Sequence, residues 1–359
     1  MRIVHVLGTR PNFVKMAPLI AAISRRSPEF DQVIVHTGQH YDRLMSEIFF
    51  DQLGVPAPDH MLEVGSGTHA QQTARVMERL EPILAGDRPD LVVVPGDVNS
   101  TVAAALTAVK LDIPVAHLES GLRSHDRTMP EEINRIVTDQ ISDILYVHSE
   151  EAVRNLELEG VPAERAHFVG NTMIDSLVAL QERFRPLETC RSHGLEPGSY
   201  LLVTLHRPAL VDGPLLFEAV AALNQVSSVL PVLFPVHPRT RARLAGNAEL
   251  SEDFHLVDPA GYLEFLSLEA DAAAVLTDSG GIQEETTYLG VPCFTLRDNT
   301  ERPVTIELGT NVLLGLDPAR IDEIPAIVAG REPGETGPPP LWDGHAADRI
   351  ADLIADLAP

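Results

Sequence analysis

Cysteine is almost absent from this chain, with only Cys190 and Cys293 among 359 residues. Two distant cysteines cannot form a disulfide framework or a clustered metal site, so the sequence predicts no metal and a reducing compartment, the cytoplasm. No apolar run approaches the roughly 18 residues of a membrane-spanning helix, and the apolar run in Met1–Gly8 is too short for a signal peptide. We therefore expect no association with a membrane.

Positive charge is also scarce. The chain has 27 lysines and arginines against 52 acidic residues, which gives a formal net charge of −25 at pH 7. This charge disfavours binding to nucleic acid or to an anionic membrane. An anionic ligand would need locally concentrated positive charge. One of the two lysines, Lys15, follows Arg10 closely and would help to supply it.

Short β-branched runs alternate with helical patterns along the chain. The runs in the first half are Ile3–Leu7, Gln32–His36, Leu91–Val94, Val115–Leu118 and Ile144–Val147. The pattern restarts after about Phe168, with Tyr200–Leu205, Val232–Val236, His255–Val257, Ala273–Leu276 and Cys293–Leu296. Apolar strands that alternate with helices predict parallel sheets buried on both faces.

The length of the chain exceeds the usual size of a single core, so two domains are expected. The predicted fold class is α/β, with two doubly wound Rossmann-like domains facing across a cleft. We place the N-terminal domain at residues 1–170 and the C-terminal domain at 171–359. The amphipathic helical stretch at about 346–357 could pack back on the first domain.

Two glycine-containing turns follow strands in separate halves of the chain. The first is Gly8–Pro11, and the second is Ser279–Gly281, at the start of a helix that carries Glu285. Such a turn points backbone N–H groups and the positive end of a helix dipole at an anion. Either turn alone could be a simple tight turn. Together they predict that the cleft holds a nucleotide phosphate, with Ser279 as a helix cap and Glu285 near the ribose hydroxyls.

Acidic residues follow two neighbouring strands of the first half. Asp97 and Glu119 each come after an apolar run, and Glu131 lies in the first turn of a helix that begins near Pro130. Each acid has a simpler interpretation alone, since Asp97 could cap a helix and the pair Glu131–Glu132 could stabilise a helix dipole. Because these strand ends share one edge of a sheet, we expect the three acids to converge.

Histidines follow two strands of the second half. His206 comes after Tyr200–Leu205, and His237 repeats the placement one strand later. Further along, Arg302 supplies another cation. The ends of these strands therefore carry groups that could contact a ligand, although a histidine at such a position is often an ordinary loop residue.

At the level of motifs, the chain resembles the non-hydrolysing UDP-N-acetylglucosamine 2-epimerases, a family with the two-domain GT-B fold. The matching segments occur in family order over nearly the whole length: Gly8–Pro11, Lys15–Pro18, Gly96–Asp97, His117–Arg123, Met129–Arg135, Val169–Thr172, Leu205–Arg207, Pro235–Pro238, Asp278–Glu285 and Arg297–Pro303. Two departures lie near the expected sugar: Ala209 and Leu210 replace a polar pair, and the loop between Glu119 and Glu131 is shorter than in some members and lacks their tryptophan.

The resemblance implies a catalytic group of Asp97, Glu119, Glu131 and His206, and a homodimer that needs no cofactor. It also implies a set of residues that bind the UDP-sugar: Arg10, Lys15, His237, Ser279, Gly280, Gly281, Glu285 and Arg302.

The implied reaction inverts C2 of UDP-N-acetylglucosamine and gives UDP-N-acetylmannosamine. UDP is eliminated to leave a 2-acetamidoglucal and then adds back. Two alternatives remain open: C2 epimerisation of a modified sugar, such as a UDP-2,3-diacetamido-uronate, and sugar transfer by a GT-B glycosyltransferase.

Overall fold

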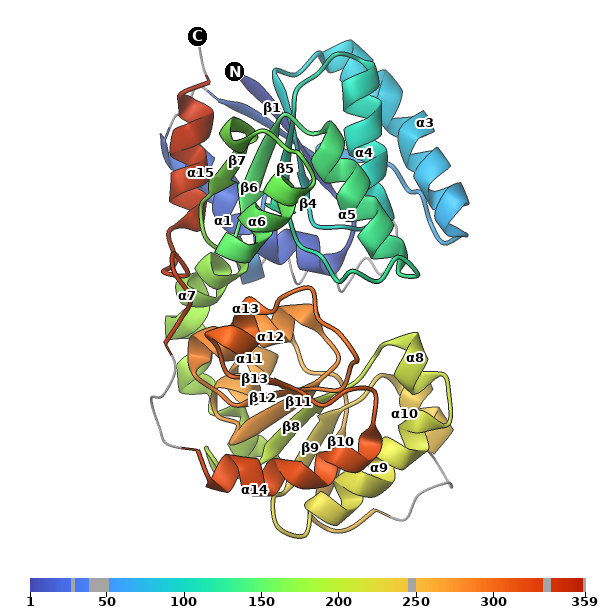
Figure 1. Ribbon diagram of the computed structural model, residues 1–359, viewed down its shortest axis with the longest axis vertical. Coiled ribbons are helices and arrows are strands. Elements are labelled where there is room, and N and C mark those ends of the chain that lie inside the picture. The colour runs from blue at the N-terminus through green and yellow to red at the C-terminus, as the bar shows by residue number, and fades with distance from the viewer. Residues whose placement is uncertain (27–29, 39–51, 245–249, 332–336, 358–359) are drawn as a thin grey trace. The chain divides into compact units, whose positions relative to one another are not determined.

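The computed structural model describes residues 1–26, 30–38, 52–244, 250–331 and 337–357, and divides the chain into two units (Figure 1). Unit 1 comprises residues 1–178 and 340–359, and unit 2 comprises residues 179–339. The sequence predicted a boundary at 170/171 and assigned residues 171–359 to the second domain, with the helix at about 346–357 able to pack back on the first. The structure instead divides the chain inside one continuous helix, α7 (Thr172–Phe184), and counts residues 340–359 with unit 1.

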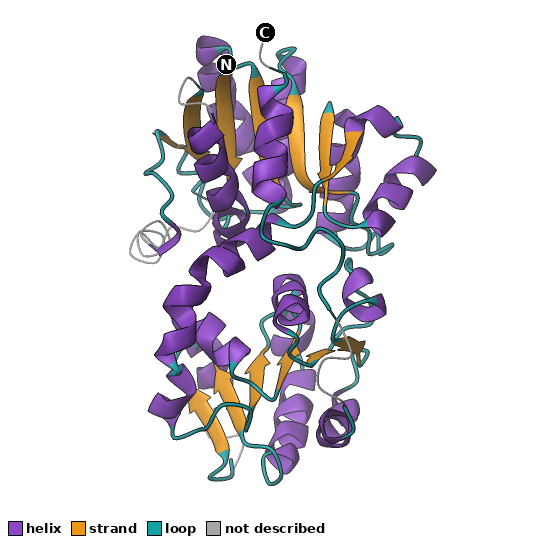
Figure 2. Cartoon of the chain, turned by 90° about the vertical axis from the view of Figure 1, so that its left-hand side faces the viewer, coloured by secondary structure: helices purple, strands orange, loops and turns teal. Residues whose placement is uncertain are grey.

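Unit 1 is built on a parallel sheet. Its seven strands among the described residues have the order β3-β2-β1-β4-β5-β6-β7. Their bounds are β1 (Arg2–Leu7), β2 (Asp31–His36), β3 (His60–Met61), β4 (Leu91–Pro95), β5 (Val115–Ser120), β6 (Ile144–Val147) and β7 (Ala166–Phe168). Helices lie on both faces of this sheet (Figure 2). They are α1 (Arg10–Arg26), α3 (His69–Asp87), α4 (Asn99–Lys110), α5 (Pro130–Ile141), α6 (Glu150–Leu158), α7 and α15 (Ala346–Ala355).

The two faces of this sheet have separate apolar cores because side chains alternate along each strand. In β1, Ile3 and Leu7 pack with α1 and α15, whereas Val4 and Val6 pack with α3 and α4. All these strand side chains are buried, so the strands read as continuous apolar runs. The predicted parallel, doubly wound sheet is confirmed.

Helix α15 returns the end of the chain to unit 1. Ile350 and Ile354 are fully buried in the core that α1 lines. Asp175 accepts hydrogen bonds from the N–H groups of Ala346 and Ala347 (3.1 and 2.6 Å), so its carboxylate caps the first turn of α15. Burial of Asp175 raises the pKa of its carboxyl to about 6 despite these bonds. The amphipathic stretch therefore buries its apolar side against α1.

Unit 2 repeats the architecture with a parallel sheet of six described strands in the order β10-β9-β8-β11-β12-β13. Their bounds are β8 (Leu201–Thr204), β9 (Val232–Pro235), β10 (Phe254–Val257), β11 (Ala274–Thr277), β12 (Cys293–Thr295) and β13 (Asn311–Leu313). Its α-helices are α8 (Pro208–Val211), α9 (Leu215–Val226), α10 (Pro238–Leu244), α11 (Tyr262–Ala270), α12 (Gly280–Leu289), α13 (Val304–Glu307) and α14 (Ile324–Ala329). Across the described ranges, no helix combines the length and apolarity needed to cross a membrane.

Candidate functional site

In unit 1, two of the three predicted acids lie at the carboxyl ends of adjacent strands. Asp97 follows β4, and Glu119 lies near the end of β5, its neighbour in the sheet. Arg135 on α5 donates from Nη2 to Asp97 Oδ2 at 2.6 Å, and Asn134 Nδ2 donates to the Asp97 carbonyl at 2.9 Å. Helix α5 therefore fixes both the backbone and the carboxylate of Asp97.

Glu131 and Glu132 both lie in the first turn of α5, as expected, but their environments differ. Glu132 is buried and accepts hydrogen bonds from the N–H groups of Ser124 and His125 (both 2.9 Å) and from Arg135 Nη1 (2.7 Å). Glu131 is only partly buried. Glu132 thus anchors the loop before α5, whereas the partly exposed Glu131 suits contact with a ligand.

Glu119 has an unusual backbone. Its φ is +70°, and the pairing of β5 with β6 shifts register between Leu118 and Ser120, so the strand bulges at Glu119. A left-handed conformation of a residue other than glycine costs about 1–3 kcal/mol and is concentrated at functional sites. The bulge turns the Glu119 side chain out of the regular alternation of the strand. Its carboxylate forms an ion pair with Lys15 of α1, and both side chains are at least 90% buried, with exposed fractions of 8% and 10%.

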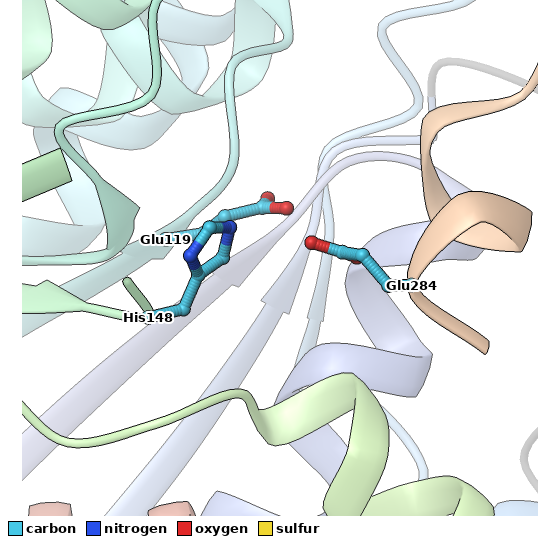
Figure 3. Close-up of side chains that lie close together, drawn as sticks. All are labelled: Glu119, His148 and Glu284. Carbon is cyan, nitrogen blue, oxygen red and sulfur yellow. The ribbon is translucent and has the colours of Figure 1, made fainter. Parts of the chain in front are cut away.

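His148 also belongs to this edge, although sequence analysis did not single it out. It follows β6, and one of its ring nitrogens lies within 4.8 Å of a Glu119 carboxylate oxygen (Figure 3). Its ring packs edge-on against Trp342 with the centroids 5.9 Å apart, and Trp342 Nε1 donates to the His148 carbonyl at 2.9 Å. The placement of His148 directly after a predicted strand was the signal that could have found it.

The remaining predicted group of unit 1 is Arg10. It lies within the first glycine-containing turn and begins α1, but its side chain lies outside the described part of the structure. Asn12 Oδ1 accepts hydrogen bonds from the N–H groups of Gly8 and Thr9 at 3.1 and 3.0 Å. The turn after β1 is therefore held by a side chain of the helix that follows it.

In unit 2, the buried carboxylate of Asp278 organises the end of β8. Its Oδ2 accepts the N–H groups of His206 and Arg207 at 2.8 and 2.7 Å, and its Oδ1 lies 2.8 Å from His206 Nδ1. Burial alone would raise the pKa of Asp278. The hydrogen bonds and the charge of His206 outweigh this effect and hold the pKa of Asp278 below its usual value. The sequence analysis included Asp278 in the matching segment Asp278–Glu285 but gave this residue no role.

His206 itself is exposed to solvent, with 63% of its side chain accessible. Because Asp278 engages Nδ1, the other ring nitrogen, Nε2, is the one presented outward. His237, the second predicted histidine, follows β9 and is also exposed. These two predicted histidines therefore lie at strand ends of one sheet, where both are accessible to a ligand.

The amino end of α12 packs against a guanidinium group. A Cβ on Gly280 would lie 2.4 Å from Arg302 Nη1, so only glycine leaves room for this contact. Glu284 Oε1 lies 2.8 Å from Arg302 Nε and orients the guanidinium. The expected cap by Ser279 is absent: its side chain accepts no hydrogen bond from a backbone N–H of α12. Glycine and an uncapped helix start leave these backbone N–H groups to bind an anion.

Glu285 lies one turn further along α12 and is almost fully buried, with 4% of its surface exposed. The Tyr262 hydroxyl donates to its Oε1 at 3.2 Å. Burial is the main reason why the pKa of Glu285 rises to about 8, and the charge of Glu284 adds to the shift. Glu269 on α11 is completely buried, and burial together with Glu285 raises its pKa as well.

A model of the family described as UDP-N-acetylglucosamine 2-epimerase matches residues 22–355. The chain belongs to the UDP-N-acetylglucosamine 2-epimerase family. Members of this family are isomerases, so the chain is an enzyme of that class. The resemblance stated from the motifs is therefore confirmed.

Relatives of known name match this family member over its whole length. It is 39% identical to the UDP-N-acetylglucosamine 2-epimerase of Methanocaldococcus jannaschii, with 99% of each chain covered. It is 42% identical to the UDP-2,3-diacetamido-2,3-dideoxy-D-glucuronate 2-epimerase of Pseudomonas aeruginosa, with 99% of this chain and 100% of that one covered. The first relative's crystal structure, in complex with UDP-GlcNAc and UDP, matches with a TM-score of 0.90, 39% identity, and 99% and 100% coverage. The predicted GT-B fold class of two Rossmann-like domains is thus confirmed.

Proposed function

We propose that this protein is a non-hydrolysing epimerase that converts UDP-N-acetylglucosamine into UDP-N-acetylmannosamine. The observation that carries the proposal is full-length identity of 39–42% to relatives named as UDP-N-acetylglucosamine 2-epimerases. The acids at the strand ends of unit 1 support it, because a glycosyltransferase would not need several carboxylates at the sugar.

The chemistry requires a leaving group to activate C2. No carbonyl acidifies the C2 proton, so direct removal would be very slow. When the C1–O bond breaks and UDP departs with the electron pair, positive charge at C1 acidifies that proton. A carboxylate then accepts it, and a 2-acetamidoglucal forms. Protonation of C2 from the other face and return of UDP to C1 complete the inversion, with no net oxidation or reduction.

We assign the proton transfers to the acids of unit 1. Asp97, Glu119 and Glu131 form the catalytic group, together with His206 of unit 2. Lys15 forms an ion pair with Glu119, and Arg135 forms one with Asp97. Ionised carboxylates offset positive charge at C1 and accept the C2 proton.

The UDP-binding groups are assigned mainly to unit 2. Arg302 and the amino end of α12, with Ser279, Gly280 and Gly281, would stabilise the diphosphate during departure and return. Glu285 would hydrogen-bond the ribose. Three further cationic or titratable groups complete the proposed UDP-sugar contacts: Arg10, Lys15 and His237.

The direct test is incubation of the purified protein with UDP-N-acetylglucosamine in deuterated water, without an acceptor. We expect UDP-N-acetylmannosamine carrying deuterium at C2, and slow release of UDP and 2-acetamidoglucal. Epimerisation that retains the original C2 hydrogen would contradict proton removal at C2. Stoichiometric release of free N-acetylmannosamine would identify a hydrolysing epimerase, and failure to epimerise any UDP-sugar would favour the glycosyltransferase.

A second candidate substrate is a UDP-2,3-diacetamido-uronate. Two observations favour it: the 42% identity to the Pseudomonas aeruginosa enzyme of that name, and the apolar residues Ala209 and Leu210. Leu210 is buried, whereas the Ala209 side chain lies outside the described part of the structure. NMR analysis of products from a panel of UDP-sugars would rank the two substrates by kcat/KM.

The assembly and compartment are further parts of the proposal. We propose a homodimer, as the family resemblance implies. Light scattering of the purified protein measures the mass of the assembly in solution and so tests this proposal. Cys190 and Cys293 are both free and buried, which fits the reducing cytoplasm proposed from the cysteine count.

A further inference from the structure

The strained backbone of Glu119 needs an anchor within unit 1. On one side of Glu119 lies His117, and on the other lies Gly121, whose φ is +80°. A Cβ on Gly121 would lie 2.4 Å from the Ala152 carbonyl oxygen, so the chain passes close to α6 there. Both flanking residues form hydrogen bonds to one side chain of α5, that of Asp139.

The His117 ring joins two elements of the sheet edge. Its Nδ1 lies 2.6 Å from Asp139 Oδ1, and its Nε2 lies 2.7 Å from the carbonyl oxygen of Gly96. Gly96 directly precedes Asp97 and itself donates its N–H to the Leu118 carbonyl at 2.9 Å. The His117 and Asp139 side chains are completely buried. The pair thus connects the turn of Asp97 to the bulge of Glu119.

These contacts define the protonation state of His117. A carbonyl oxygen only accepts hydrogen bonds, so Nε2 must donate. Besides the His117 ring, two donors, the Gly121 N–H and Arg123 Nη1, bind Asp139. Burial alone would raise the pKa of Asp139, but the charges and hydrogen bonds of His117 and Arg123 outweigh burial and hold its pKa below the usual value. An ionised carboxylate also only accepts, so Nδ1 must donate as well. Both ring nitrogens therefore carry protons, and His117 is an imidazolium.

Two of the other buried histidines of unit 1, His5 and His36, provide a contrast. Burial lowers the pKa of His5 and of His36 to about 4, so both are neutral near pH 7. His5 contacts the amide of Gln32 at 2.9 Å rather than a carboxylate. Among the described residues, neither of these two rings faces a carboxylate as His117 faces Asp139.

Asp139 has a second set of contacts through Oδ2. This oxygen accepts the Gly121 N–H at 3.1 Å and Arg123 Nη1 at 2.7 Å. Arg123 in turn donates from Nε and Nη2 to the carboxylate of Glu159 at 2.7 and 2.6 Å. One carboxylate therefore holds the chain on both sides of Glu119, with a cation on each of its oxygens.

We propose that Asp139 and the His117 imidazolium are positioning residues that hold the Glu119 bulge and the Gly96–Asp97 turn in the geometry required for proton transfer at C2. This inference rests on the proposed function, because it uses the roles given to Glu119 and Asp97. Neither positioning residue touches the substrate. Their effect is on the orientation of the two carboxylates, so it falls on turnover rather than on binding.

The charge on His117 is tested by NMR of the wild-type protein labelled with ¹⁵N-histidine. At pH 8, where exposed histidines are neutral, we expect one imidazole with both nitrogens protonated. The signal should disappear in His117→Gln. In Asp139→Asn, the amide can donate to Nδ1, so the same ring should become neutral while keeping its bond to Gly96. Absence of a doubly protonated imidazole in the wild type at pH 8 would overturn the inference without any variant.

The positioning role is tested by the kinetics of Asp139→Asn. We expect kcat to fall by about 10²-fold, as for a misplacement of reacting groups by about 1 Å, with KM changed less than twofold. Glu159→Gln is the matched control, because it alters the outer end of the same network, and its kcat should stay near wild type with the His117 signal unchanged. A folded Asp139→Asn protein with wild-type kcat would refute the role. Absence of epimerisation by the wild type would refute the proposed function instead, and the NMR result would still stand.

Discussion

Two pairs of acids, Asp97 and Glu119 in unit 1 and Glu269 and Glu285 in unit 2, have opposite electrostatic environments. In unit 1, Asp97 faces Arg135 and Glu119 faces Lys15, so each carboxylate has a cation beside it. In unit 2, Glu285 accepts a hydrogen bond from a neutral tyrosine, and both carboxyl oxygens of Glu269 lack a hydrogen-bond partner among the described residues. Cations favour the ionised form of an acid, and burial favours the neutral form. The first pair is thus suited to proton acceptance, and the second pair to hydrogen bonding by neutral carboxyls.

The largest expected effect comes from neutralising the acids of unit 1. Asp97→Asn, Glu119→Gln and Glu131→Gln should each lower kcat by about 10²–10⁴-fold, the range for loss of a general acid or base. The affinity for UDP should remain within a few fold of wild type, because the proposed diphosphate contacts lie in unit 2. Steady-state kinetics with calorimetric titration of UDP measure both quantities. Full activity in any one variant would remove that residue from the catalytic group.

A smaller effect, on binding, is expected at the amino end of α12. Gly280→Ala places a methyl group 2.4 Å from Arg302 Nη1, so the guanidinium must move away from the helix start. We expect the Kd for UDP to rise by about tenfold, the equivalent of one lost charge-assisted hydrogen bond. Gly86→Ala in α3 is the matched control, because its Cβ would meet no atom within 4 Å, and it should leave the Kd unchanged. An unaltered Kd for UDP in Gly280→Ala would show that Arg302 does not bind the nucleotide.

The smallest effect concerns stability and follows from the acids of unit 2. Burial raises the pKa of Glu285 to about 8 and also raises that of Glu269. The folded state therefore holds protons that the unfolded state releases near pH 4.5. Stability from these groups is complete below that pH and is lost as the pH rises toward 8 and above.

Glu269→Gln removes one of these titrations without changing the shape of the side chain. We expect its Tm at pH 8.5 to exceed that of the wild type by about 3 °C, with little difference at pH 5. Thermal unfolding monitored by circular dichroism at the two pH values gives this comparison. A lower Tm for the variant at pH 8.5 would show that the Glu269 carboxylate stabilises the fold.

Strong periodic signals in the sequence predicted most of the fold. The long apolar runs and the helix that starts at Pro130 were found, because burial on both faces and helix-start chemistry leave local patterns. Strands β3, β7 and β13 were missed, since each has only two or three residues and no more than partial apolar character. The division of the chain inside α7 leaves no local signal, because a continuous helix gives no break in pattern.

The positions of candidate residues were predictable next to a strand end, and not where a contact depends on distant partners. Asp97 and Glu119 lie at neighbouring strand ends, as predicted. Asp139 was not, because it contacts His117 across 22 positions of sequence and lies within an ordinary helical pattern. The Ser279 cap was predicted from residue type alone, and the structure does not form it.

The central claim is that UDP leaves C1 before the configuration at C2 is inverted. The most direct measurement uses UDP-N-acetylglucosamine carrying ¹⁸O in the oxygen that joins C1 to the β-phosphate. If the C1–O bond breaks, the freed β-phosphate can rotate, and ¹⁸O should appear in its non-bridging positions during epimerisation, as detected by ³¹P NMR. Inversion of C2 with all the ¹⁸O retained in the bridge would contradict the account.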